Sequence, residues 1–133
     1  MCCTNESTVA VKLLAVTVLT SLDEQGLNAV GQQTPVSAQV ERLAQLAKEA
    51  GLAGVVCSAH EIAQLRSKLG PNFVLMVPGI RPKGSETGDQ KRIMTPEEAM
   101  KLGATHLVIG RPITGAESPE EKAREINQSL LAA

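Results

Sequence analysis

Four short apolar runs, each followed by a loop and a segment with helical periodicity, set the strongest limit on how this chain can fold. The runs read KLLAVTVLT (12–20), LAGVVCS (52–58), NFVLMVPG (72–79) and THLVIG (105–110). They are continuous rather than alternating and rich in Val, Leu and Ile, which is typical of strands covered on both faces in a parallel sheet. The repeating strand and helix order therefore predicts an α/β fold with four parallel strands.

Helical patterns with a period of 3.6 residues separate the runs. Val36, Val40 and Leu43 fall on one face of the segment that follows Pro35, and Gly51 is placed to end that helix. Further helices are expected over 60–70 ending at Gly70, from a start signal at Thr95, Pro96 and Glu98, from a similar signal at Ser118, Pro119 and Glu121, and over roughly 22–30.

The length of 133 residues limits how much of a barrel this pattern can build. A closed eight-stranded (β/α)8 barrel needs about 250 residues, so four units give either an open doubly wound sheet or half of a barrel. The first eleven residues, MCCTNESTVAV, have no helical face and are expected to be a poorly ordered lead-in to one domain over 12–133.

The composition argues against partners that need charge or aromatic rings. The formal net charge is -1, and Phe73 is the only aromatic residue, so neither nucleic acid nor a membrane surface is an expected partner. The apolar run from Leu13 is too short to span a bilayer.

Cysteine and histidine placement argues against disulfides and metals. Cys2 and Cys3 are adjacent and Cys57 lies in an apolar run, which predicts a reduced, cytoplasmic compartment. His60 and His106 are single and lack ligand spacing from a cysteine, so no metal site is expected.

Polar residues that follow the apolar runs are the candidates for binding a ligand, because ligands collect at the carboxyl ends of parallel strands. In VIGRPIT, Gly110 lets the backbone approach a ligand and Arg111 offers a planar fork suited to phosphate oxygens, although a plain turn with a solvated arginine fits the same letters. Ser58 is suited either to a flat polar ligand or to a helix cap. The long loop over 78–92 carries Arg81 and Gln90 and is either a ligand-covering loop or a solvated surface loop.

Together these motifs resemble a known family. LLAVTVLTS, GLAGVVCSA, VPGIRPKGSETGDQKRIMTPEEA and HLVIGRPIT are similar to the carboxyl-terminal half of bacterial orotidine 5'-monophosphate decarboxylases, from about Lys12 to the end of the chain. The resemblance implies the carboxyl-terminal (βα)4 half of a TIM barrel. It also implies decarboxylation of orotidine 5'-monophosphate to uridine 5'-monophosphate in pyrimidine biosynthesis, without a cofactor.

The resemblance also assigns roles to particular residues. Arg111 and the Gly110 backbone correspond to the phosphate grip, with Gln90 helping to close over it. Arg81 and Thr20 fall at other ligand-binding positions, and Ser58 corresponds to a contact with the pyrimidine ring.

The chain departs from the family where the chemistry is done. The family's proton-donating lysine and partner aspartates form a Lys-x-x-Asp-type constellation on earlier strands, whereas this chain has only Asp23 and Asp89, and neither follows a lysine by three positions. No catalytic residue is therefore expected in this chain. The alternative to a decarboxylase half is a non-catalytic phosphate- or nucleotide-binding half-barrel. Because a half-barrel leaves two strand edges and one sheet face open, it is expected either to self-associate, as a homodimer that completes a barrel-like core, or to aggregate and be marginally stable.

Overall fold

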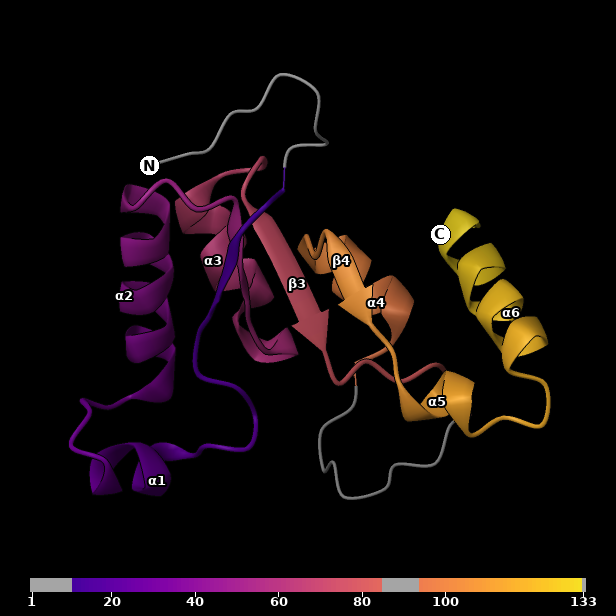
Figure 1. Ribbon diagram of the computed structural model, residues 1–133, viewed down its shortest axis with the longest axis horizontal. Helices are drawn as coiled ribbons and strands as arrows, with labels where there is room; N and C mark the ends of the chain where they lie inside the picture. Colours follow the sequence, from indigo (N-terminus) through magenta and orange to yellow (C-terminus); the bar gives the residue numbers. More distant parts are fainter. Residues whose placement is uncertain (1–10, 85–93, 133) are drawn as a thin grey trace.

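One parallel sheet of four strands forms the centre of the protein, in the spatial order β1-β2-β3-β4 (Figure 1). The computed structural model describes residues 11–84 and 94–132. The strands are β1 (Leu14–Val16), β2 (Gly54–Val56), β3 (Val74–Pro78) and β4 (His106–Val108), and every neighbouring pair is parallel. The four strands expected from the apolar runs are confirmed, although each is shorter than its run at both ends.

Helices connect the strands in the expected alternation. They are α1 (Glu24–Ala29), α2 (Val36–Glu49), the 3-10 turn η1 (Ala59–Glu61), α3 (Ile62–Leu69), α4 (Pro96–Leu102), α5 (Arg111–Thr114) and α6 (Pro119–Leu131). The short α5 and the η1 turn were not expected, since neither is long enough to show a helical period.

The helix ends follow the local sequence signals in most places. Thr95 accepts a hydrogen bond from the N–H of Glu98, and the Glu98 carboxylate accepts one in return from the N–H of Thr95, so the expected capping box is present. Gly51 and Gly70 follow α2 and α3 with φ of 79° and 86°, in the left-handed region that glycine adopts readily. Ser118 precedes α6 as expected, but its side chain makes no capping hydrogen bond.

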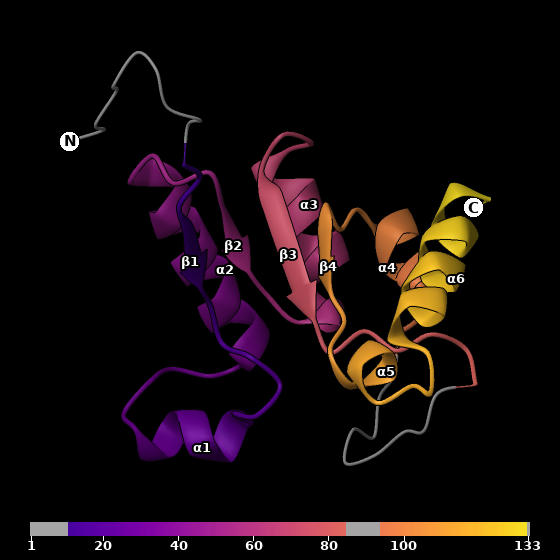
Figure 2. The same cartoon turned by 45° about the vertical axis from the view of Figure 1, so that its right-hand side comes forward.

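Helices cover one face of the sheet and build the core there. Figure 2 shows α2, α3 and α4 lying behind the strands. Val55, Leu75 and Val77 point to that side and are completely buried. They pack in one cluster with apolar residues of the helices, among them Val40, Ala44, Ile62, Leu65 and Ala99.

The other face of the sheet is apolar but has no covering layer among the described residues. Strand register places Val16, Val56, Met76 and His106 in one row, with Val108 beside Pro78 in the next. We call this row and Val108 the open face. Val16 is 62% exposed and Val108 46% exposed. The expectation that both faces are covered is thus wrong for this chain by itself, while the open sheet face expected of a half-barrel is confirmed.

One glycine is required by the sheet itself. Gly54 pairs with Val74 across β2 and β3, and a Cβ at Gly54 would lie 2.1 Å from the carbonyl oxygen of Val74. Any side chain here would push β2 away from β3, so Gly54 holds the strands at the spacing that aligns their carboxyl ends. The lead-in expected over 1–11 falls almost wholly outside the described residues.

Candidate functional site

The carboxyl ends of the four strands lie at one edge of the sheet, and the candidate ligand-binding residues leave the strands there. Figures 1 and 2 both show the chain after β3 running next to α5, the helix that follows β4. Ser58 follows β2, Arg81 follows β3, and Arg111 begins α5. The topology therefore brings three of the predicted site residues to one end of the sheet.

Ser58 is buried at the end of β2 and interacts with a carboxylate. It is 4% exposed, and its hydroxyl donates a hydrogen bond to Oε2 of Glu61, which is also buried. Ser58 occupies the capping position before η1, yet its side chain makes no capping hydrogen bond. The helix-cap interpretation of Ser58 is therefore wrong: its oxygen accepts no backbone N–H at this turn.

Cys57 precedes Ser58 and serves the packing of this end of β2. It is completely buried in the core cluster. Burial, and then the nearby Glu61 carboxylate, raise the pKa of the Cys57 thiol to about 12. The thiol stays protonated at neutral pH, which makes Cys57 a small apolar side chain rather than a nucleophile.

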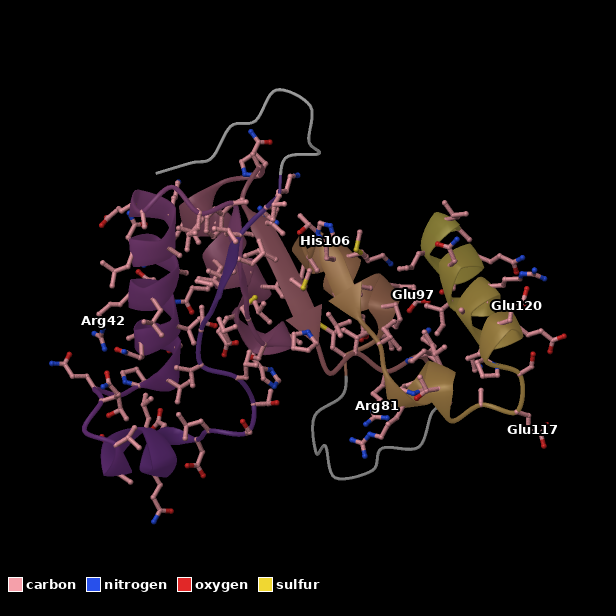
Figure 3. The ribbon with its side chains drawn as sticks, viewed as in Figure 1. Arg42, Arg81, Glu97, His106, Glu117 and Glu120 are labelled. Atoms are coloured by element: carbon pink, nitrogen blue, oxygen red, sulfur yellow. The ribbon has the colours of Figure 1, made fainter. Side chains whose placement is uncertain are left out.

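Arg81 is the most buried arginine of the candidate set. It is 7% exposed, and its backbone N–H donates a 3.1 Å hydrogen bond to the carbonyl oxygen of Met94. Figure 3 places it beside α5, below the end of β3. Its guanidinium group makes no hydrogen bond to any described residue, which leaves its donors available for an anion.

Gly110 and Arg111 form the turn from β4 into α5. The carbonyl oxygen of Gly110 accepts hydrogen bonds from the N–H groups of Ile113 and Thr114 at 2.9 and 3.1 Å, which closes the turn. A Cβ at Gly110 would meet no atom within 4 Å, so the backbone here is open to an approaching group. Arg111 is exposed at the first position of α5.

Thr20 lies farther from the sheet than its place in the apolar run suggested. The first strand ends at Val16, and Thr20 is an exposed residue of the turn that leads to α1. The residue that continues the strand is Thr17, whose N–H and hydroxyl both bond the carbonyl oxygen of Val56, at 3.1 and 2.9 Å. Its position inside the run LAVTVL could have singled it out, since a threonine there must satisfy its hydroxyl locally.

The remaining predictions concern Gln90, metal binding and membrane-spanning helices. Gln90 lies outside the described residues. No group of three or more His, Cys, Asp or Glu side chains that could hold a metal ion is found in residues 11–84 and 94–132. No helix in those ranges has the length and hydrophobicity that a bilayer-spanning segment requires.

Asp23 has a structural role away from the strand ends. Its Oδ1 accepts a 2.8 Å hydrogen bond from the N–H of Gly26 and caps α1, where the side chain is exposed. An exposed capping carboxylate is not the buried acid that would act beside a lysine. The chain's other aspartate, Asp89, lies outside the described residues.

A hollow beside β4, away from the strand-end site, is lined by none of the predicted site residues. It has a volume of about 470 Å³ between β4, α4 and α6. Its lining is mainly apolar and includes Met100, Leu107, Ile109, Ile126 and Leu130. In a parallel α/β sheet, the helix after one strand packs over the groove beside the next strand. The hollow therefore marks the edge where the described sheet has no further strand.

Known proteins match the chain in both sequence and structure. The sequence matches the Orotidine 5'-phosphate decarboxylase / HUMPS family over residues 3–126. It is 56% identical over 118 residues to an orotidine 5'-phosphate decarboxylase of Pseudoalteromonas translucida, covering 89% of this chain and 50% of that protein. A second decarboxylase, from Aliivibrio fischeri, is 54% identical over 120 residues, with 90% of this chain and 51% of that protein covered.

The structural likeness points to the same family. The crystal structure of orotidine 5'-phosphate decarboxylase from Lactobacillus acidophilus superposes with a TM-score of 0.81 and 36% identity, over 96% of this chain and 52% of that one. The chain thus spans about half the length of the relatives it matches, and its four parallel strands with their helices form half of a TIM-barrel fold. The chain belongs to the orotidine 5'-phosphate decarboxylase / HUMPS family.

Proposed function

We propose that this chain carries the phosphate- and pyrimidine-binding half of an orotidine 5'-monophosphate decarboxylase site. The observation that carries the proposal is the convergence of Ser58, Arg81 and Arg111 at the carboxyl ends of three neighbouring strands. The relatives named above supply the substrate class, since they are orotidine 5'-phosphate decarboxylases.

The phosphate end of the ligand is assigned to the last two strand ends. A guanidinium fork binds phosphate oxygens through two parallel, charge-assisted hydrogen bonds, and Arg111 and Arg81 both bring such a group to this edge. The open backbone of Gly110 lets a phosphate approach the start of α5 closely. Gln90 and Thr20 complete the proposed set on the strength of the family resemblance alone.

The pyrimidine end is assigned to β2, where Ser58 stands. Its buried position provides a water-poor environment in which one hydrogen bond to a flat ring discriminates strongly.

Catalysis requires groups that this chain does not supply in the family's manner. Loss of carbon dioxide leaves negative charge at a ring carbon, which a positioned ammonium must stabilise and protonate. Binding energy at a remote phosphate raises the rate only when it is converted into transition-state stabilisation at the ring. The proposed role of this chain is therefore to hold the substrate, and turnover is expected only where the lysine and aspartates are also present.

A non-catalytic nucleotide-binding half-barrel is the second candidate function. The observation that favours it concerns the aspartates that a decarboxylase would need. The chain has only two, and one of them, Asp23, caps α1. A single assay separates the candidates: the absorbance of orotidine 5'-monophosphate is followed with the purified chain mixed with the lysine- and aspartate-bearing half of a family decarboxylase, and uridine 5'-monophosphate binding to the chain is measured in parallel. Turnover that is lost in Arg111→Ala supports the enzyme, whereas binding without turnover supports the binding module. If the chain shows no binding and no turnover, both candidate functions are contradicted.

The open face gives the reason to propose a homodimer. Val16 and Val108 expose apolar surface that a barrel would cover, and β1 and β4 each present an unpaired edge among the described strands. A second copy related by a two-fold axis along the barrel would pair β4 of each copy with β1 of the other and remove both edges at once. We also retain the cytoplasm as the proposed compartment, on the cysteine usage described above.

A further inference from the structure

Glu61 is a buried carboxylate whose hydrogen bond goes to a residue of the proposed site. It is 8% exposed, at the end of the η1 turn that follows β2. Its Oε2 accepts the hydroxyl hydrogen of Ser58. Within the described residues no cation is paired with it in a salt bridge. One hydrogen bond from a hydroxyl group does not offset the free energy cost of burying a carboxylate. The position of Glu61 therefore suggests a role other than stabilising the fold.

The hydrogen bond between Ser58 and Glu61 differs from the helix cap that their sequence spacing predicts. Ser58 and Glu61 have the spacing of a capping box, in which the serine oxygen accepts the backbone N–H of the glutamate. Here that N–H donates instead to the carbonyl oxygen of Ser58, at 3.3 Å, and the serine hydroxyl turns to the carboxylate. The hydroxyl is thus oriented by the Glu61 side chain and not by the helix.

The direction of this hydrogen bond determines what Ser58 can offer to a ligand. The Ser58 hydroxyl is the donor in this hydrogen bond, so its single hydrogen is committed to Glu61. The Oγ atom then presents only lone pairs to any third group. A free serine hydroxyl rotates to donate or to accept, whereas this one is restricted to accepting.

We propose that Glu61 is a positioning residue that fixes Ser58 as a hydrogen-bond acceptor and so selects pyrimidines with a protonated ring N3. The inference rests on the proposed function, because it takes Ser58 to contact the ring. Uracil and orotate carry a hydrogen on N3 and satisfy the acceptor. Cytosine has a lone pair at N3, which would face the lone pairs of Oγ in a buried site.

A purely structural role for Glu61 makes a different prediction. Removing the carboxylate would then lower stability and weaken every ligand to the same degree. A positioning role instead changes the ratio of two affinities. Uridine and cytidine 5'-monophosphates share the same ribose phosphate, so the phosphate contribution cancels from their ratio, and only the ring contact remains.

The test is calorimetric titration of the full chain with each of the two nucleotides, in wild type, Glu61→Gln and the control Glu125→Gln. Glu125 is an exposed residue of α6 paired with Lys122, so the control makes the same chemical change away from the site. Wild type and control should prefer the uridine nucleotide by about tenfold or more. In Glu61→Gln, whose amide can donate as well as accept, the preference should fall to about threefold or less.

Thermal melting shows whether each variant is folded. If Glu61→Gln fails to fold, Glu61→Asp keeps the charge but shortens its reach to Ser58 by one methylene, and the same loss of preference is expected. An undiminished preference in the folded variant overturns the role of Glu61 and leaves the proposed function standing. If wild type binds neither nucleotide, the proposed function fails, and this inference fails with it.

Discussion

The backbone N–H of Arg81 and the carbonyl oxygen of Met94 are joined by a 3.1 Å hydrogen bond, so the two ends of the long β3–α4 connection meet beside the sheet. This contact keeps Arg81 at the carboxyl end of β3, where its side chain is almost completely buried. A buried guanidinium group without a hydrogen-bonded partner among the described residues is expected to gain one from a ligand.

Replacing Arg81 by methionine should therefore weaken nucleotide binding. Methionine retains most of the apolar stem and removes only the charged fork, so the affinity for uridine 5'-monophosphate should fall about tenfold. Arg42→Met, on the outer side of α2 (Figure 3), is the control and should leave the affinity unchanged. A variant that melts at a lower temperature but binds as wild type would assign Arg81 to stability alone.

Arg66 should be important for stability rather than binding. Its guanidinium group donates to the carbonyl oxygens of Gly70, Phe73 and Gly103, at 2.6, 2.8 and 2.6 Å, and so ties α3 to the start of β3 and the end of α4. Arg66→Met leaves these oxygens without that donor and should lower the free energy of unfolding by about 2–4 kcal/mol in urea denaturation.

The control for this prediction is Arg124→Met. Arg124 is an exposed residue whose described partner is Glu120 on the same helix, so its loss should change the free energy of unfolding by less than about 0.5 kcal/mol. If the two substitutions change the free energy of unfolding equally, the hydrogen bonds of Arg66 contribute no more to stability than a surface ion pair does.

The capping box at α4 should make stability depend on pH. The backbone N–H of Thr95, and then its hydroxyl, lower the pKa of the Glu98 carboxyl below its usual 4.5. A lowered folded-state pKa gives stability that is present above pH 4.5 and lost as the pH falls through the folded pKa. Thermal melts should therefore show wild type above Glu98→Gln at pH 7, with the gap closing near pH 3. A gap that is the same at both values would contradict this account.

Local signals in the sequence predicted the secondary structure well where one residue decides the geometry. Gly51, Gly70 and the Thr95 capping box end or begin helices as expected. Ser118 has the same sequence signal as Thr95, but its backbone ψ of 91° differs from the 158° at Thr95, and its hydroxyl does not bond the helix. The capping hydrogen bond therefore depends on the backbone conformation of the preceding loop, which the short capping motif does not determine.

The site was harder to predict because it depends on contacts between strands. The place of Ser58, Arg81 and Arg111 after successive strands was predictable from the apolar runs. The orientation of the Ser58 hydroxyl was not, because an S-x-x-E sequence fits both a cap and the observed bond to Glu61. Thr17 was missed for a similar reason, since its bond to Val56 depends on how β1 is aligned with β2.

The open face should drive self-association in solution. Val16→Lys places a charge on this face at the β1 edge, where the second copy is proposed to pair, and sedimentation velocity should show wild type as a dimer and the variant as a monomer. Leu46→Lys is the matched control, because Leu46 on α2 is 60% exposed, close to the 62% of Val16. A wild-type chain that sediments as a monomer and melts cooperatively would rule out the dimer.

The most direct test of the proposed function is a calorimetric titration of uridine 5'-monophosphate into wild type and Arg111→Ala. Arg111 lies at the start of α5, on the proposed phosphate grip, and Arg124→Ala serves as a control for the loss of one positive charge. Wild type and control should bind the nucleotide, and Arg111→Ala should bind at least about tenfold more weakly. Equal affinity in all three proteins, or no binding by wild type, would contradict the assignment of this chain as a nucleotide-binding half of the decarboxylase site.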